Sequence, residues 1–212
     1  KEYIERKITM TMYERMKKGL VYDPMDAEII GDQHVYQEAC FKFNQLSPTQ
    51  SEEKKAYMKK YFAECGEGCY IELPFRANWG GAHLHFGNKV YANFNLTLVD
   101  DDHIYVGNHV MIGPNVTMTT ANHPICPELR EKEYQFNKEI VIGDNVWIGA
   151  NVTILPGVHI GNNSVIGAYS LVTKDIPENV VAYGIPCKVV REISDYDHEY
   201  YCKGSKIDWE NL

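Results

Sequence analysis

The spacing of apolar positions differs between the two parts of this chain. Up to about residue 65, apolar residues recur at helical spacing among charged ones, and glycine is rare. This pattern predicts three helices, over residues 2–18, 26–46 and 49–65. Each run is bounded by turn or capping residues: Gly19, Ser47-Pro48, Thr49 with Glu52 as a capping box, and Gly66.

After residue 66, an aliphatic residue recurs every six positions. Counting from residue 142, the successive positions hold β-branched aliphatic side chains: Ile142, Ile148, Ile154, Ile160, Ile166 and Val172. The same phase occurs upstream at Phe86, Val106 and Ile112. A period of six matches neither an α-helix nor one long strand. It matches a coil of three short strands, each with one inward aliphatic residue and a turn, so the sequence predicts a solenoid with a narrow stacked core.

Asparagine and glycine gather where such coils must turn. Both residue types tolerate positive φ, and five asparagines lie near the expected corners: Asn108, Asn145, Asn151, Asn162 and Asn163. A β-sandwich with frequent glycine turns is the ordinary alternative, but sandwiches space their turns at about 8–12 residues. The residues themselves do not set the hand of the coil, and the general rule for parallel crossovers favours the right hand.

A polar, charged insertion interrupts the repeat at about residues 118–139. This stretch cannot continue the inward pattern, so it predicts a loop that protrudes from the solenoid, where functional residues are often found. It contains His123, followed by Pro124. We expect three parts in the chain: an N-terminal helical segment at 1–65, the solenoid with its inserted loop at 66–193, and a C-terminal tail at 194–212.

Charge and composition exclude several classes of protein. The 212 residues include 21 Lys and Arg against 29 Asp and Glu, a net charge of −8, whereas a nonspecific nucleic-acid binder or a basic membrane-surface protein needs a basic surface. No apolar run approaches the ~18 residues of a membrane span, and the charged start lacks a signal core. We therefore expect a cytoplasmic protein without nucleic-acid or membrane partners.

The six cysteines do not form the pattern of a disulfide or zinc scaffold. Their spacing is irregular, which favours reduced thiols in a chain of this size. Cys65 and Cys69 are the only close pair, and no second pair completes a zinc site.

Four stretches together resemble a known family: YANFNLTLVDD at 91–101, NVTMTTANHP at 115–124, IGDNVWIGANVTILPGVHIG at 142–161 and SVIGAYSLVTKDIPENVVAYGIPCKVVREI at 164–193. With the N-terminal helical segment, the chain is similar to the maltose/galactoside O-acetyltransferase family over about residues 13–191. The resemblance implies a mainly β fold, the left-handed parallel β-helix of hexapeptide repeats. It also implies acetyl-CoA as co-substrate, a sugar hydroxyl as acceptor, no metal, and a homotrimer with active sites between subunits.

The resemblance further implies a set of catalytic and acceptor-binding residues. His123 would be the general base on the sugar hydroxyl during direct attack in a ternary complex, a role suited to histidine near neutral pH. Asn93 would hydrogen-bond the acceptor hydroxyl or the developing oxyanion, because an amide can both donate and accept. The other acceptor contacts would be Asp23, with Asp26 as an alternative, and Asn78, Asp101 and Tyr134.

A second group of residues would bind acetyl-CoA by the same resemblance: Trp147, Gly149, Ala150, Ala168, Thr173, Lys174, Lys188 and Arg191. Ala150 stands where some relatives have serine, so a side-chain hydroxyl contact is absent. Lys188 stands where arginine is common, which keeps the charge but loses bidentate phosphate recognition. Tyr169 replaces a residue that is often small, and it would narrow the donor groove or close over it.

Two other functions stay open at this point. The acceptor could be a xenobiotic hydroxyl or an amino sugar instead of a plain sugar, and a non-catalytic hexapeptide-repeat scaffold would share the same fold. The presence of His123 and Asn93 argues against the scaffold. A γ-class carbonic anhydrase is disfavoured because the histidine spacing does not match its zinc site.

Overall fold

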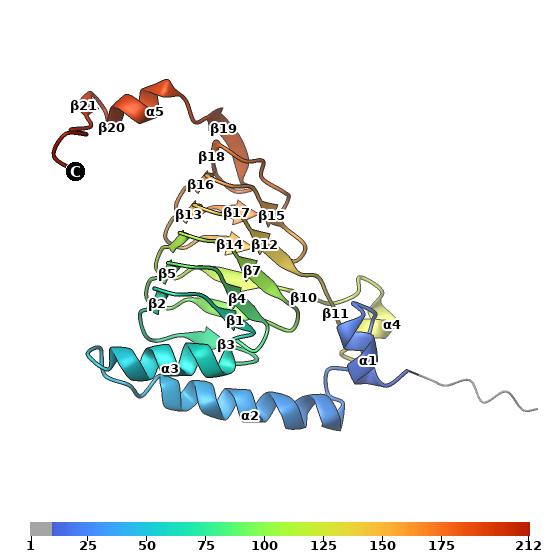
Figure 1. Cartoon of the computed structure of the whole chain (residues 1–212). Coiled ribbons are helices and arrows are strands. Elements are labelled where there is room, and N and C mark those ends of the chain that lie inside the picture. The colour runs from blue at the N-terminus through green and yellow to red at the C-terminus, as the bar shows by residue number, and fades with distance from the viewer. Residues whose placement is uncertain (1–9) are drawn as a thin grey trace, which may run out of the picture.

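The chain winds into a three-faced stack of parallel β-coils, covered at one end by two helices (Figure 1). This computed structural model describes residues 10–212. After the helices, the chain passes over the first, second and third faces in turn and then returns to the first. This path confirms the coil of three short strands that the six-residue spacing predicts.

Each face of the stack is one sheet. The first face contains β1 (Glu64–Cys65), β4 (Leu84–Phe86), β7 (Ile104–Val106), β12 (Ile140–Ile142) and β15 (His159–Ile160). The second contains β2 (Tyr70–Ile71), β5 (Tyr91–Ala92), β8 (Met111–Ile112), β13 (Trp147–Ile148), β16 (Val165–Ile166), β18 (Val180–Tyr183) and β19 (Lys188–Glu192). The third contains β3 (Arg76–Ala77), β6 (Thr97–Val99), β9 (Thr117–Thr119), β14 (Thr153–Ile154) and β17 (Leu171–Val172). Within these faces the strand pairs are parallel, except that β19 lies antiparallel to β18.

Inward aliphatic side chains form the core of the stack. The six predicted positions from Ile142 to Val172 are each at most 2% exposed. On the second face, Ile148 pairs in register with Ile112 on one side and Ile166 on the other. Equivalent side chains therefore lie over one another from coil to coil, as the repeat predicts.

One residue at most corners adopts the left-handed conformation. It lies three positions after an inward residue, as at Asn145, Asn151 and Asn163, where φ is +55°, +57° and +60°. Asparagine tolerates this region better than most residues, and Asn145 Nδ2 also donates to Asn163 Oδ1 at 3.1 Å. Asn108 and Asn162 lie beside corners, where their side-chain oxygens accept backbone hydrogen bonds from neighbouring coils at 2.9 and 2.8 Å.

The first two helices agree with their predictions in place but differ at their ends. Helix α1 (Met12–Lys17) begins after Thr11, which caps it, so the predicted start at residue 2 is wrong where it covers residues 10–11 and otherwise lies outside the described residues. Helix α2 (Ala27–Phe43) is confirmed, with Asp26 as its N-cap. It ends before the predicted break at Ser47-Pro48, because Asn44 already caps its C-terminus.

Helix α3 (Ser51–Tyr61) is present, but its predicted caps are wrong. Gln50 is the N-cap, and the Thr49 hydroxyl lies 3.1 Å from the hydroxyl of Ser47 instead of capping the helix. Gly66 lies beyond the helix end, where its N–H donates to Phe86 O at 2.9 Å. A Cβ at Gly66 would lie 2.5 Å from the Gly87 carbonyl oxygen, so glycine serves the close approach of two coils there.

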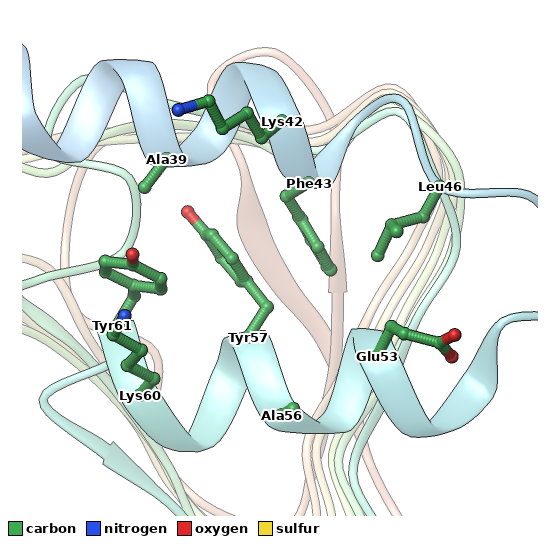
Figure 2. A pocket seen from close by; sticks show the side chains of 9 residues that line it. All are labelled: Ala39, Lys42, Phe43, Leu46, Glu53, Ala56, Tyr57, Lys60 and Tyr61. Carbon is green, nitrogen blue, oxygen red and sulfur yellow. The ribbon is translucent and has the colours of Figure 1, made fainter.

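Helices α2 and α3 cover the end of the core next to the first coil (Figure 1). Phe43 of α2 and Tyr57 and Met58 of α3 are buried against it. A pocket of about 270 Å³ lies between the two helices. The rings of Phe43 and Tyr57, which line it (Figure 2), stack with their centroids 4.0 Å apart. None of the residues predicted to bind substrate lines this pocket.

The insertion folds into a small unit beside the stack. Strand β10 (Ala121–Asn122) pairs antiparallel with β11 (Phe136–Asn137), and α4 (Pro127–Arg130) lies between them along the chain. Helix α1 lies next to this unit (Figure 1). At the far end of the stack, a C-terminal arm extends away from the coils, with α5 (Asp195–Glu199), β20 (Tyr200–Cys202) and β21 (Ser205–Lys206) (Figure 1). Within residues 10–212, no helix is long and apolar enough to cross a membrane.

The stacked core makes a prediction for Ile148→Ala. Because Ile148 is fully buried between two isoleucines, truncation should leave a cavity and lower the free energy of unfolding by about 2–5 kcal/mol. Thr153→Ala, at a half-buried position in the same coil, is the control and should cost less than about 0.5 kcal/mol. Urea denaturation at a fixed protein concentration measures both, and equal losses would contradict the stacked core.

Candidate functional site

The protruding loop places His123 directly after strand β10. Its imidazole Nδ1 lies 2.9 Å from the carbonyl oxygen of Tyr134. A carbonyl oxygen can only accept, so Nδ1 carries the proton of the neutral ring and Nε2 is left as a proton acceptor. The side chain is exposed. His123 therefore has the tautomer that a general base requires, and it is the carbonyl of Tyr134, rather than its hydroxyl, that makes this contact.

The N-terminal segment holds the loop in this geometry. Tyr22 and Gln135 exchange two backbone hydrogen bonds of 2.9 and 3.0 Å, which fixes the chain next to Tyr134. The Tyr22 hydroxyl is buried among the side chains of Gln135 and Asn137, and burial raises its pKa to about 12. It therefore stays protonated. The segment before α2 thus positions the carbonyl that orients His123.

Asp101 lies at the centre of a buried polar cluster beside the loop. Its carboxylate accepts hydrogen bonds from Asn78 Nδ2, at 3.1 Å to each oxygen, and from Trp79 Nε1 at 3.0 Å. Asn137 Nδ2 donates to its carbonyl oxygen at 3.0 Å. The structure therefore brings together Asn78 and Asp101, two of the predicted acceptor residues.

The neighbouring Asp100 is fully buried and holds a backbone turn in place. It accepts the backbone N–H groups of Trp79 and Gly81 at 2.7 and 3.0 Å. Burial outweighs these two bonds and raises the pKa of Asp100 to about 7. Burial also raises the pKa of Asp101, against the lowering effect of its bonds from Trp79 and Asn78. Asp100 fixes the turn that carries Asn78 and Trp79 toward Asp101.

A cleft of about 270 Å³ opens beside Asn78 and Asp101. The two residues line it together with Gln135 and with one side of α2, which contributes Gln33 and Gln37. Gln37 Nε2 donates to the Asn78 carbonyl oxygen at 3.3 Å. The cleft is thus rich in amide groups that can both donate and accept hydrogen bonds.

The two candidate N-terminal carboxylates differ in what they already bind. Asp26 is the N-cap of α2, and its side chain accepts the N–H of Glu28 at 3.0 Å. Asp23 accepts the N–H of Met25 at 2.9 Å and lies beside Pro24, which lines the cleft. Both residues adjoin the lining of the cleft, Asp23 through Pro24 and Asp26 through Met25, but Asp26 is committed to helix capping.

The three-faced stack has the shape of a prism, and Asn93 lies on its edge between the second and third faces. Its backbone N–H donates to Ile112 O at 2.9 Å, and its side-chain oxygen accepts the N–H of Phe94 at 2.8 Å. The second bond turns Oδ1 toward the backbone and leaves Nδ2 as a donor that has no hydrogen-bond partner among the described residues.

Three of the predicted donor-binding residues share that edge with Asn93. The N–H of Gly149 donates to Ile166 O at 2.8 Å. This bond is equivalent to the one from Asn93 N to Ile112 O, two coils earlier in the stack. A Cβ at Gly149 would lie 2.6 Å from Ala168 N, so the coils approach closely there, and Ala150 and Ala168 are small side chains along the same line. Trp147 lies on the adjoining second face and is 52% exposed.

The remaining donor candidates lie elsewhere. Thr173 and Lys174 follow β17, at the edge between the third and first faces, and both are exposed. Lys188 and Arg191 belong to β19. Arg191 is already paired, because its two terminal nitrogens donate to the carboxylate of Asp197 at 2.7 and 2.8 Å, which holds the pKa of Asp197 well below its usual range.

The predicted residues therefore divide between two edges of the prism. Asn78, Asp101 and the loop with His123 follow strands of the third face, at the edge between the third and first faces. Asn93 and Gly149 lie at the edge between the second and third faces. The third face separates the two edges, so a single chain does not bring His123 and Asn93 to one point.

The part of the chain that the structure describes contains no set of side chains arranged as metal ligands. No group of three or more His, Cys, Asp or Glu residues within residues 10–212 is arranged to hold an ion. His85 and His103 do meet on the first face, with Nε2 and Nδ1 2.8 Å apart. That pair packs beside Tyr105, with the ring of His83 next to His103 and Glu64 Oε2 3.2 Å from His85 Nδ1.

Comparison with known proteins identifies the family. A family model described as "Bacterial transferase hexapeptide (six repeats)" matches residues 139–174, and "Maltose acetyltransferase hexapeptide capping motif" matches residues 15–66. The galactoside O-acetyltransferase of Lactococcus lactis is 55% identical over 200 residues, which cover 94% of this chain and 97% of that protein. The chain belongs to the maltose/galactoside O-acetyltransferase family.

Other members of the maltose/galactoside O-acetyltransferase family agree in sequence and fold. The galactoside O-acetyltransferase of Escherichia coli is 43% identical over 201 residues, covering 95% of this chain and 98% of that protein. A solved galactoside acetyltransferase in complex with coenzyme A is 44% identical and superposes with a TM-score of 0.90, over 94% of this chain and all of that one. The coils are thus those of the left-handed parallel β-helix, as the resemblance implied, and the general crossover rule gives the wrong hand here.

The structure adds cleft residues that the sequence does not single out in this family member. Gln33 and Gln37 of α2 and Gln135 of the loop line the cleft with Asp101. Polar residues at helical spacing are ordinary on a solvent-facing helix, so no local pattern distinguishes the two on α2. Only the packing of α2 over the end of the stack, next to β3, gives them this place.

The buried Asp100 makes a prediction about pH and stability. In the unfolded chain its carboxyl ionises near 3.8, but burial holds its proton up to about pH 7. Between these values the unfolded state binds fewer protons, so the free energy of unfolding falls as pH rises. Asp100→Asn lacks this titration, and wild type should lose about 2–4 kcal/mol more than the variant across the window. Urea denaturation at a series of pH values tests this, and parallel curves for the two proteins would refute it.

Proposed function

We propose that this chain transfers an acetyl group from acetyl-CoA to a hydroxyl group of a sugar, with His123 as general base. The hydrogen bond from His123 Nδ1 to the Tyr134 carbonyl, 2.9 Å long, carries the proposal because it leaves Nε2 ready to accept a proton. The relatives named galactoside O-acetyltransferase and the solved relative in complex with coenzyme A support the choice of acceptor and donor.

His123 acts on the proton of the acceptor. Its Nε2 takes the hydroxyl proton as the sugar oxygen attacks the thioester carbonyl, and the imidazolium that forms keeps its Nδ1–H bonded to Tyr134 O. The same proton is then available to the departing sulfur. Acetyl-CoA supplies the acetyl group as an activated thioester, and the chain supplies the proton transfer and the positioning.

Asn93 stabilises the charge that develops on the carbonyl oxygen. Its Oδ1 is held by the N–H of Phe94, so Nδ2 is the free end of the amide. A fixed donor aimed at a developing oxyanion is worth more in the transition state than in the ground state. The donor approaches along the same edge, past Ala150 and Ala168, with Trp147 beside them on the second face.

A single sugar ring suits the acceptor cleft. Its volume of about 270 Å³ is slightly below the range of about 300–1,000 Å³ typical of sites for drug-sized ligands. The carboxylate of Asp101 is already occupied by Asn78 and Trp79, and the rest of the polar lining is mostly amides. Such a lining suits hydroxyl groups, with Asp23 and the Tyr134 side chain as further acceptor contacts.

The complete site lies between chains in this proposal. His123 and Asn93 lie on different edges of one prism, so His123 of one copy must meet Asn93 of another. The second face carries a row of exposed side chains in register, Tyr91, Met111 and Trp147, which are 38%, 52% and 52% exposed. A flat apolar row of this kind suits packing against a second copy, and a homotrimer closes such contacts with cyclic symmetry.

The exposed cations suit the phosphates of the donor. Lys174 and Lys188 are free of ion pairs among the described residues, whereas Arg191 is held by Asp197. All six cysteines lie within the described residues and are free thiols, which is typical of a reducing compartment and supports a cytoplasmic enzyme.

The reaction itself is tested by acceptor-dependent release of the CoA thiol. We expect thiol release from acetyl-CoA with galactosides, maltose or glucose, and less with chloramphenicol, because a cleft of about 270 Å³ suits a sugar ring better than a larger aromatic acceptor. Release with chloramphenicol alone would favour a xenobiotic acceptor. No release with any acceptor would favour a scaffold and contradict the proposal.

His123→Ala tests the general base. Removing the proton acceptor should lower kcat by about 10²–10⁴-fold and leave the KM values closer to wild type. His159→Ala, which removes an exposed histidine from the first face, is the matched control and should keep wild-type turnover. Wild-type turnover by His123→Ala would remove His123 from the mechanism.

Met111→Glu tests the assembly. A charge in the apolar row of the second face should separate the copies and lower activity in parallel, while His123 stays in place. Val35→Glu, at a 64% exposed position on α2, is the control. Light scattering measures the mass and thiol release the activity. A fully active monomer would contradict a site between chains.

A further inference from the structure

The first corner of the solenoid holds two cysteines where the later coils hold apolar pairs. Cys65 pairs in register with Phe86, and the bond from Tyr70 N to Val90 O, 2.9 Å long, sets Cys69 opposite Val90. Phe86 and Val90 flank the next corner and are both buried. Cys65 and Cys69 therefore flank their own corner with both side chains turned toward the core.

The two side chains lie on either side of this corner, and both pack against the edge of the core. Cys65 Sγ lies 3.7 Å from the Gly66 carbonyl oxygen. Cys69 Sγ also lies 3.0 Å from the Gly87 carbonyl oxygen. This is the first coil of the stack, next to α3, and both thiols are only half-buried there. Small reagents can therefore reach them.

The chain between the two cysteines is short and contains two glycines. It has the sequence Gly66-Glu67-Gly68, and Gly68 takes φ of +72° at the corner. Lys59 of α3 forms an ion pair with Glu67 at 2.7 Å, which ties the corner to the helical cap. Glycine restricts φ and ψ less than any other residue, so Gly66 and Gly68 favour adjustment of this corner toward the geometry of a disulfide bond.

We propose that Cys65 and Cys69 are an oxidative modification site that closes to a reversible disulfide within one chain. The oxidant is a peroxide such as hydrogen peroxide. A thiolate sulfur attacks one peroxide oxygen, and an S–O bond forms as the O–O bond breaks. The products are a sulfenic acid on the cysteine and a hydroxide ion, which departs. The second sulfur then attacks the first, the S–S bond forms, the S–O bond breaks and water leaves. Both sulfurs are oxidised and one peroxide is reduced.

The Cys65 side chain also promotes the reactive form of Cys69. It lowers the pKa of Cys69, with the backbone N–H groups of Val90 and Lys89 adding to the effect and burial opposing it. The Cys69 side chain in turn raises the pKa of Cys65. Ionisation of Cys69 gives up its own bond to Gly87 O. Attack on peroxide by either sulfur ends in the same disulfide, so the outcome does not depend on which thiol ionises.

Mass spectrometry of the peroxide-treated protein tests the site. Trypsin releases both cysteines in one peptide, residues 61–76, because no Lys or Arg lies between Lys60 and Arg76. After treatment and thiol alkylation, we expect this peptide to lack two hydrogen atoms and carry no alkyl group. Dithiothreitol before alkylation should restore two alkylated thiols. Cys126 and Cys202 are exposed and serve as internal comparisons for isolated thiols.

Cys65→Ser and Cys69→Ser separate a pair from two independent thiols. In each variant the remaining cysteine should stay alkylatable or gain oxygen, without a cross-link. The treated wild type should also melt at a higher temperature than the reduced protein, and Cys65→Ser should show no such rise. The proposal fails if both thiols stay alkylatable while Cys126 is oxidised, or if either cysteine cross-links to another chain instead. Both readouts are independent of the acetyltransferase proposal.

Discussion

The inward aliphatic side chain that every coil must bury is the constraint on which the rest of the structure depends. Ile112, Ile148 and Ile166 lie in register, so each coil is held at a fixed height and rotation over the one before it. Residues at equivalent positions of different coils therefore form columns along the edges of the prism. Asn93 and Gly149 belong to one such column, although they are far apart in sequence. The core thus fixes where a ligand can run along an edge.

The loop meets a different requirement, because in the proposed mechanism the imidazole of His123 must present one defined nitrogen to the acceptor. The rigid coils supply the anchor points of β10 and β11, and the backbone bonds between Tyr22 and Gln135 hold the chain next to Tyr134. The carbonyl of Tyr134 then sets the tautomer of His123. The polar cluster around Asp101 extends this arrangement to the cleft, so that the proposed acceptor site is lined by the loop, by α2 and by residues that follow strands of the third face.

Sequence reasoning succeeds here where one local rule controls the structure. The burial of Ile142 through Val172 follows from the six-residue period, and α2 follows from its apolar spacing. It fails where two local rules compete. Thr49 and Glu52 predict a capping box, but the N-cap of α3 is Gln50. Gly66 suits a helix end equally well by its residue type, and only the approach of the next coil shows its actual use.

The candidate site divides in the same way. Motif resemblance singles out His123, Asn78 and Asp101, and the last two do meet in the structure. The places of Gln33 and Gln37 could not be predicted, because they depend on how α2 packs over the end of the stack, beside residues such as Asn78 and Asp101, which follow both glutamines by more than 40 positions. His123 and Asn93 are separated because they follow strands of different faces. The six-residue repeat alone does not give this separation, since it also requires knowing which face the insertion follows.

Subunit mixing tests the central claim most directly. Chains with His123→Ala and chains with Asn93→Ala should each be nearly inactive alone, because every site lacks one group. After equal amounts are dissociated and reassembled together, about one quarter of the sites should pair an intact His123 from one chain with an intact Asn93 from another, if trimers assemble at random. The account predicts that activity returns toward this fraction. If the mixture stays as inactive as its components, His123 and Asn93 do not act across chains.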